Sequence, residues 1–165
     1  IDVPENYGTA ISREARQDTR YVDAITHALR RMREEFPKAR HILVGHGNGG
    51  ISAAMQSVLE KPPVDAIAFS APDISAFPMR WGPDQARLPI KFIVHEDDHC
   101  GASPRSLGIS TRTQHMAGRK YPLTVIKSPS LGAKSECFMS PAPHFFTNNQ
   151  HDYATAIMRW AAALK

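Results

Sequence analysis

A glycine-rich turn carries the strongest chemical signal in this sequence of 165 residues. The run Leu43-Val44-Gly45-His46-Gly47-Asn48-Gly49-Gly50 lies between a short apolar stretch and an amphipathic one, which indicates a sharp turn from a strand into a helix. In so tight a turn we expect Gly45 and Gly49 to let neighbouring backbone pass close by. The central position, Gly47, is then forced toward a strained region of backbone conformation.

Phosphate binding is one interpretation of this turn. Gly45, Gly47 and Gly50 match the G-x-G-x-x-G fingerprint of dinucleotide-binding loops. That fingerprint is paired with an acidic residue about 20 residues further on, at the end of the following strand. The strand that follows here ends in Phe69-Ser70-Ala71-Pro72 and offers no carboxylate. A nucleotide-binding protein is therefore the weaker alternative.

Residues 41–54 resemble the strand, nucleophile elbow and helix of serine esterases and lipases in the α/β-hydrolase superfamily, whose G-x-S-x-G motif often reads GHSxGG. Gly47 occupies the position of the nucleophilic serine. The resemblance covers nearly the whole chain but only the later half to two-thirds of the superfamily's domain. It implies a carboxylic-ester hydrolase by ancestry, which as written should not run serine-esterase chemistry.

The superfamily's order of serine, acid and histidine continues along the chain. The loop after the third apolar run holds Asp97 and Asp98, and the resemblance implies that Asp98 is the catalytic acid, with Asp97 as second choice. His144, shortly before the last helix, matches the general base. The backbone N–H of Asn48 would be one oxyanion-hole donor. We interpret His151 as a solvated first-turn residue and the other histidines as surface or packing residues (His27, His41, His46 and His115).

Two cysteines flank these segments. The resemblance to a bacterial subgroup of the superfamily implies a disulfide between Cys100 and Cys137, which would mean a periplasmic or secreted protein; two unpaired thiols remain the alternative. A metal site is a further alternative, because several potential ligands stand close together in one loop (His95, Asp97, Asp98, His99 and Cys100). Adjacent residues in one loop rarely converge on one ion, so we expect no metal and no other cofactor.

Apolar runs alternate with amphipathic stretches along the whole chain. Helices are expected where apolar residues recur at three- and four-residue steps, around residues 22–36, 51–59 and 153–164, with a weaker one at 106–117. Strands are expected at 41–44, 66–69, 90–94 and 123–126. Uniformly apolar strands alternating with such helices predict an α/β fold with a mostly parallel sheet of about four strands, covered by helices on both faces.

The elbow follows the first readable strand here but the fifth of about eight in the superfamily, so we expect one α/β-hydrolase-type domain, residues 1–165, that lacks its N-terminal strands. The loop that supplies the second oxyanion donor would be missing with them. The strand before the elbow would form an apolar edge, open to a second copy of the chain or to an N-terminal segment.

Charge and composition exclude some classes of binding partner. The chain has a formal net charge of +4, but its basic run, residues 30–40, is interrupted by Glu34 and Glu35 and has no aromatic platform, so we interpret it as a solvated helix face and expect no nucleic acid. No stretch approaches the ~20 apolar residues of a membrane helix. A small ester-like molecule is the expected ligand. We therefore rank an esterase without its nucleophile first, a non-catalytic small-molecule binding protein on the same fold second, and a metal or nucleotide protein third.

Overall fold

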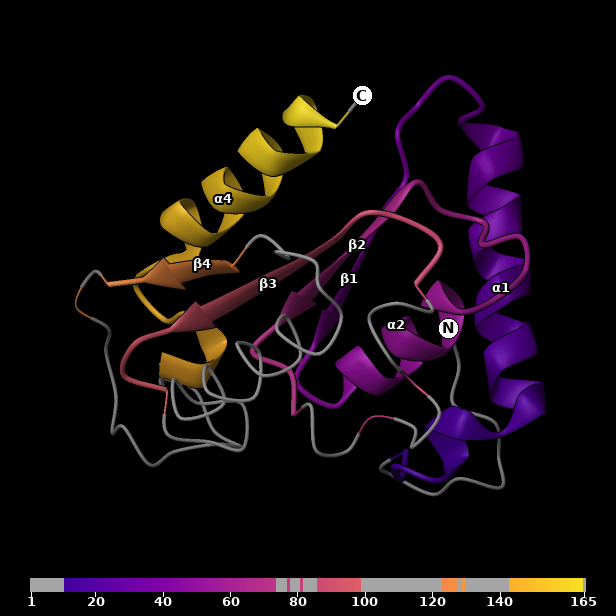
Figure 1. Cartoon of the computed structure of the whole chain (residues 1–165), viewed down its shortest axis with the longest axis horizontal. Coiled ribbons are helices and arrows are strands. Elements are labelled where there is room, and N and C mark those ends of the chain that lie inside the picture. Colours follow the sequence, from indigo (N-terminus) through magenta and orange to yellow (C-terminus); the bar gives the residue numbers. More distant parts are fainter. Residues whose placement is uncertain are drawn as a thin grey trace.

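A parallel sheet of four strands organises the molecule. The computed structural model describes residues 11–73, 77, 81, 86–98, 123–127, 129 and 143–164. The strands lie in the order β1 (Ile42–His46), β2 (Ala66–Ser70), β3 (Ile90–His95) and β4 (Leu123–Ile126). All three neighbouring pairs are parallel, so the carboxyl ends of the strands meet at one edge of the sheet (Figure 1). The predicted α/β class, with a four-stranded parallel sheet, is confirmed.

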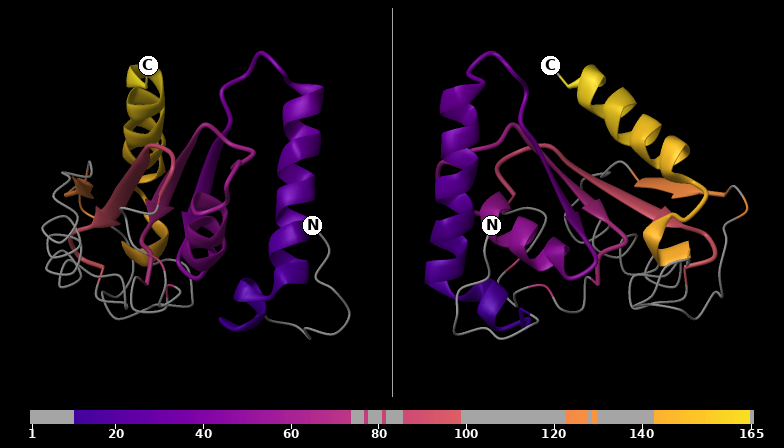
Figure 2. Two further views of the ribbon diagram at one scale, coloured as in Figure 1. Left: turned by 45° about the vertical axis from the view of Figure 1, so that its right-hand side comes forward. Right: turned by 180° about the vertical axis from the view of Figure 1, so that it is seen from behind.

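Helices lie on both faces of this sheet. The helices of the described residues are α1 (Thr19–Glu35), α2 (Gly49–Ser57) and α4 (Gln150–Ala163), with short 3-10 segments η2 (Ala15–Gln17) and η5 (Pro143–Phe145). α1 and α2 lie on one side of the sheet and α4 on the other (Figure 2). None of the described helices combines the length and the apolar character that crossing a membrane requires. The helix expected at 106–117 falls outside the described residues.

Alternating side chains of the buried strands supply two separate cores. On the α2 face, Ile67, Phe69 and Phe92 pack with residues of α2. On the α4 face, Ile93 and Ile126 pack with Phe146 and with the inner side of α4. Because successive strand residues point to opposite faces, the fully buried β2 and β3 must be apolar almost throughout.

The long helix α1 is packed at its beginning rather than along its whole apolar stripe. Asp18 caps its N-terminus by accepting a hydrogen bond from the backbone N–H of Arg20, and Val22 is buried. Further along, Met32 and Phe36 are 49% and 48% exposed, unlike the continuous stripe that periodicity predicts. The cause is visible in Figure 1, where the second half of α1 extends beyond α2.

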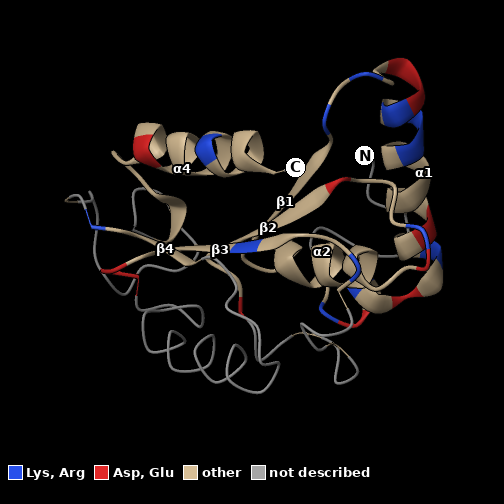
Figure 3. Cartoon of the chain, turned by 45° about the horizontal axis from the view of Figure 1, so that its top comes forward, with Lys and Arg blue, Asp and Glu red and all other residues tan. Residues whose placement is uncertain are grey.

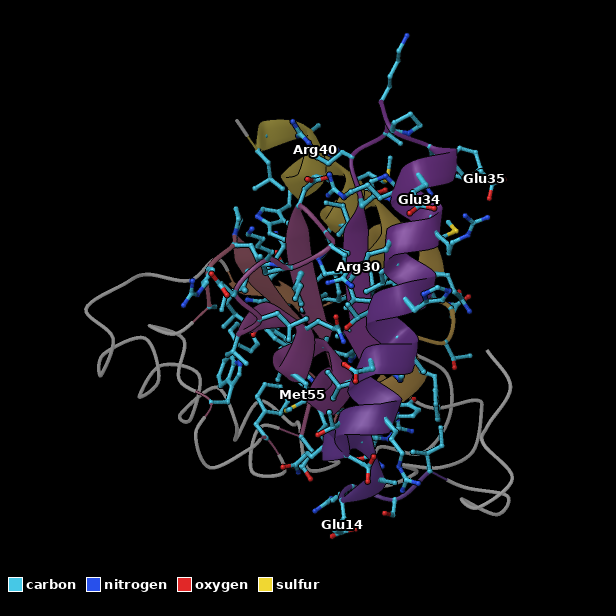
Figure 4. All side chains as sticks on the ribbon, turned by 90° about the vertical axis from the view of Figure 1, so that its right-hand side faces the viewer. Glu14, Arg30, Glu34, Glu35, Arg40 and Met55 are labelled. Atoms are coloured by element: carbon cyan, nitrogen blue, oxygen red, sulfur yellow. The ribbon has the colours of Figure 1, made fainter. Side chains whose placement is uncertain are left out.

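Charges occupy the outer side of α1. Figure 3 shows basic and acidic positions interspersed along this helix, and Figure 4 looks onto it, with Glu34 and Glu35 near its end. Arg31 pairs with Glu34 at 2.8 Å, and Arg33 reaches across to Asp65 at 2.7 Å. Part of the basic run is therefore paired with acids within the protein.

A buried polar contact fixes α1 against α2. Gln56 of α2 is fully buried. Its Nε2 donates to the backbone carbonyl of Val22 at 3.0 Å, and its Oε1 lies 3.0 Å from the hydroxyl of Thr26. The amide is thus satisfied on both sides, as a buried polar group requires. This contact sets the register between the two helices, and α2 in turn holds the turn that precedes it.

Candidate active site

The turn between β1 and α2 has the sharp geometry that its glycines suggest. Gly47 has φ +51°, in the left-handed region that L-residues rarely adopt. Its N–H donates to the carbonyl of Ser70 at the end of β2 (2.9 Å), and its carbonyl accepts from the N–H of Gly50 (3.0 Å). Position 47 is therefore tied to the neighbouring strand on one side and to the first turn of α2 on the other.

Only one of the two flanking glycines is required by close packing. A Cβ on Gly45 would lie 2.7 Å from the Cβ of Ala53 and 2.7 Å from the carbonyl oxygen of Gly49. A Cβ on Gly49 would meet no atom within 4 Å. The expectation that both glycines let backbone pass is thus wrong for Gly49. The approach is one-sided: the carbonyl of Gly49 passes over the α-carbon of Gly45, while the Cβ direction of Gly49 faces open space.

Asp98 and His144 meet at the carboxyl edge of the sheet, although 46 positions separate them. Asp98 follows the end of β3 and is fully buried. Its Oδ2 lies 3.0 Å from Nδ1 of His144, which belongs to η5 just before α4. A carboxylate can only accept hydrogen bonds, so this contact assigns the proton of a neutral imidazole to Nδ1 and leaves the lone pair on Nε2.

The free ring nitrogen of His144 faces the turn. A Cβ built on Gly47 would lie 3.3 Å from Nε2 of His144 and 3.9 Å from its Cε1. A hydroxyl carried on that Cβ would come within hydrogen-bond reach, about 2.6–3.2 Å, after a small rotation of the ring. The structure thus brings three positions together: the carboxylate of Asp98 contacts the imidazole of His144, and the imidazole faces the turn at Gly47.

Asn48 follows at the start of α2. It is the N-cap residue of that helix, with φ −62°, and it is exposed. Within the described part of the chain, its backbone N–H has no hydrogen-bond acceptor. A free N–H at the start of a helix is a suitable donor to a developing oxyanion.

His46 lies against this group, a position that the sequence interpretation missed. Its ring centre is 5.0 Å from that of His144 and 5.5 Å from that of Phe145. Its Nδ1 lies 3.0 Å from the Ser70 hydroxyl, and its buried Nε2 has no partner among the described residues. Burial, reinforced by the nearby His144, lowers the pKa of His46 to about 4, although Asp98 acts in the opposite direction. Its place directly before Gly47 was the only signal in the sequence.

Several residues near His144 have a strained backbone conformation. Among the described non-glycine residues, Ala71, Phe146 and Asn148 have φ of +42°, +54° and +68°. Phe146 is fully buried and stacks on Tyr153 of α4, with ring centres 4.5 Å apart. Such conformations persist only where packing enforces them. The fold therefore holds the segment around His144 firmly, although the residue opposite its Nε2 has no side chain.

The other residues singled out from the sequence lie elsewhere or are engaged. The backbone N–H of Asp97 donates to Nδ1 of the buried His95 at 3.0 Å, whereas Asp98 is the carboxylate next to His144. His151 is exposed in the first turn of α4, as expected. The described residues contain no group of three or more metal-ligating side chains. Cys100, Cys137 and His99 lie outside the described residues, so the disulfide stays a prediction.

Solved structures with the same fold include several hydrolases. A CIB-like hydrolase from Thermoplasma acidophilum superposes with a TM-score of 0.60 at 15% identity, over 98% of this chain and 65% of that one. An acylaminoacyl peptidase from Pyrococcus horikoshii gives 0.57 at 11%, over 87% of this chain and 28% of that one. Esterase PE8 gives 0.51 at 15%, over 93% of this chain and 67% of that one.

These likenesses establish the fold. The chain has the α/β-hydrolase fold, in agreement with the resemblance of its elbow segment. It spans 65% of the first of these proteins and 28% of the second. No protein-family profile and no curated protein matches the sequence.

Proposed function

We propose that this chain descends from carboxylic-ester hydrolases and keeps the general-base part of their site without its nucleophile. In this proposal Asp98 orients His144, His144 would take a proton from a group at position 47, and the N–H of Asn48 would stabilise an oxyanion. Gly47 supplies no hydroxyl, so no acyl-enzyme can form. The chain is then inactive toward esters and keeps a site for a small ester-like molecule.

One observation carries the proposal. The Asp98–His144 pair, joined at 3.0 Å, directs Nε2 toward the point 3.3 Å away where a Cβ of residue 47 would stand. Packing alone does not require a histidine to direct its second ring nitrogen toward an elbow with φ +51°. The hydrolases that share the fold add support of a general kind.

Restoring the hydroxyl tests the proposal. We expect Gly47→Ser to hydrolyse a small activated ester such as p-nitrophenyl acetate, with a burst that reports acylation, while the unmodified chain stays at background. The gain should be modest, because the loss of one oxyanion donor costs about 100- to 1000-fold in rate and the proposal assigns a single donor, the N–H of Asn48, to this site. The left-handed φ and the contact with His144 should also lower stability by about 1–3 kcal/mol.

Two matched variants make this result specific. Gly47→Ala carries the same backbone strain without the hydroxyl and should show no burst. Gly47→Ser combined with His144→Ala keeps the hydroxyl but loses the base, and its rate should fall back by about 100-fold or more. A Gly47→Ser protein that is folded, binds an ester analogue and still shows no hydrolysis would contradict the proposal. That outcome would favour the second candidate, a non-catalytic binding protein on the same fold.

A further inference from the structure

A hollow separate from the Gly47 turn lies between α4 and the sheet. It has a volume of about 540 Å³, within the usual range for small-molecule sites. Its described lining comes from β3, β4 and α4 (Lys91, Thr124, Ile126, His151, Asp152, Thr155, Ala156, Arg159 and Trp160). None of the residues assigned to the proposed hydrolase site is among them.

Lys91 is the unusual member of this lining. It is the only charged residue in the strands β1 to β4, and its side chain lies on the α4 face of β3, beside Ala68 of β2. Lys91 is 8% exposed, so most of its side chain is covered, and it is one of the residues that line the hollow. Burial lowers its pKa. No hydrogen bond or ion pair of Lys91 is found in the described part of the chain.

A buried cation without a counter-charge is costly for a folded protein. Lys is almost never fully buried unless it is paired, because the loss of hydration of the ammonium group is offset only by a counter-charge or by hydrogen bonds. Lys91 is the second residue of β3, next to the apolar Ile90 and Phe92, and the described residues supply no counter-charge for its ammonium group.

Arg159 adds a second cation to the same hollow. It lies on α4, is exposed, and makes no hydrogen bond or ion pair in the described part of the chain. The bands of basic residues on β3 and on α4 in Figure 3 mark the two elements that carry this pair. Thr124 and Thr155 contribute hydroxyl donors, and the half-buried Trp160 offers an aromatic wall. Asp152 is the only acid of the described lining, and it is exposed at the start of α4.

From this arrangement we infer that the hollow between α4 and the β3–β4 edge is a binding site for a small organic anion. The oxyanion group, a phosphate or a carboxylate, pairs with Lys91 and Arg159, and its organic part lies against Trp160. The charge of the ligand supplies the partner that Lys91 lacks. This site does not depend on the function proposed for Gly47.

Calorimetric titration with three probes tests the inference: inorganic phosphate, phenyl phosphate and benzoate. The unmodified chain should bind phenyl phosphate more tightly than the other two, because only that probe combines a dianion with an aromatic ring. Benzoate as the tighter ligand would instead identify carboxylates as the class. Lys91→Met keeps the length of the side chain and removes the charge, and it should weaken binding by roughly 10- to 100-fold.

Controls separate this site from others on the molecule. Lys38→Met, at an exposed lysine after α1, should leave affinity unchanged, and His144→Ala should also bind phenyl phosphate normally. Lys91→Met should remain folded, since it removes only a largely covered charge. At the same concentration of phenyl phosphate its melting temperature should rise less than that of the unmodified chain. Absence of binding by the unmodified chain at about 10 mM of each probe, or equal affinity of Lys91→Met, would overturn the inference.

Discussion

His46 stands next to the proposed base, and its surroundings keep it neutral. With a pKa near 4, it carries no charge at neutral pH, so it does not repel a proton that His144 would hold during a reaction. Its ring fills the space between Ser70 and Phe145, and thereby helps to fix the ring of His144. His46 therefore acts by packing against His144 and not through a charge of its own.

The lowered pKa of His46 predicts a pH-dependent stability. In the unfolded chain His46 takes up a proton near its ordinary value of 6.5, whereas in the folded chain it does so only near 4. The unfolded state therefore binds more protons between these values, and the stabilising contribution present above pH 6.5 is lost as the pH falls toward 4. We expect His46→Gln to lose less stability than the unmodified chain between pH 7 and pH 5, measured by urea unfolding.

A matched variant on α1 completes this measurement. His27→Gln removes an exposed histidine of that helix and should keep the pH dependence of the unmodified chain. If His46→Gln and the unmodified chain lose the same free energy over this range, burial does not depress the pKa of His46.

The grouping of three candidate positions in space was predictable from chain order and residue type, whereas their roles stay a proposal. Gly47, Asp98 and His144 follow the order of a hydrolase triad, and the structure brings these three positions together. The contact of His46 was not predictable, because it depends on the ring orientation of a residue far along the chain. The error at Gly49 has a similar origin: sequence shows that a turn is tight, but not which of its residues is approached.

At the scale of elements, the difference between Gly45 and Gly49 gives a prediction with its own control. Gly45→Ala would place a Cβ 2.7 Å from both Ala53 and the carbonyl of Gly49, which overpacks the junction of β1 and α2. We expect a loss of about 1–3 kcal/mol. Gly49→Ala meets open space at the first residue of α2 and should be neutral or stabilising by up to about 1 kcal/mol.

Thermal unfolding distinguishes the two variants. For a chain of this size, 1 kcal/mol corresponds to a shift in melting temperature of about 2–4 °C. A Gly45→Ala protein as stable as Gly49→Ala would show that the turn relaxes easily, and the rigid elbow on which the proposed function depends would then be in doubt.

The sequence predicted strands best, because both faces of the sheet are covered and the strands are therefore apolar on both sides. The four strands are the expected ones, each within two residues at either end, because buried parallel strands appear as plain apolar runs. The stripe of α1 was predicted less well, since periodicity identifies an apolar face but not how far a neighbouring helix covers it. Met32 and Phe36 belong to the face and remain about half exposed.

For the molecule as a whole, the parallel sheet explains why distant segments form one site. The turn after β1, the loop after β3 and the segment before α4 all emerge at the carboxyl edge, where an open α/β sheet commonly binds its ligands. The hollow beside Lys91 lies instead over the α4 face of β3 and β4. The fold thus separates a candidate catalytic edge from a candidate anion site, and the two can be tested independently.

The edge position of β1 leads to a prediction for the molecule in solution. Within the described part of the chain β1 pairs only with β2, and Val44 on it is 38% exposed. An exposed apolar edge strand is a template for pairing with another chain.

We expect this chain of 165 residues to self-associate as its concentration rises. Val44→Lys should weaken the association, because a charge on an edge strand opposes pairing. Met158→Lys is the matched control, since Met158 is 68% exposed and belongs to α4 rather than to β1. Sedimentation velocity over a range of concentrations measures the effect. A monomer at every concentration, or equal association of both lysine variants, would show that the edge of β1 is not used.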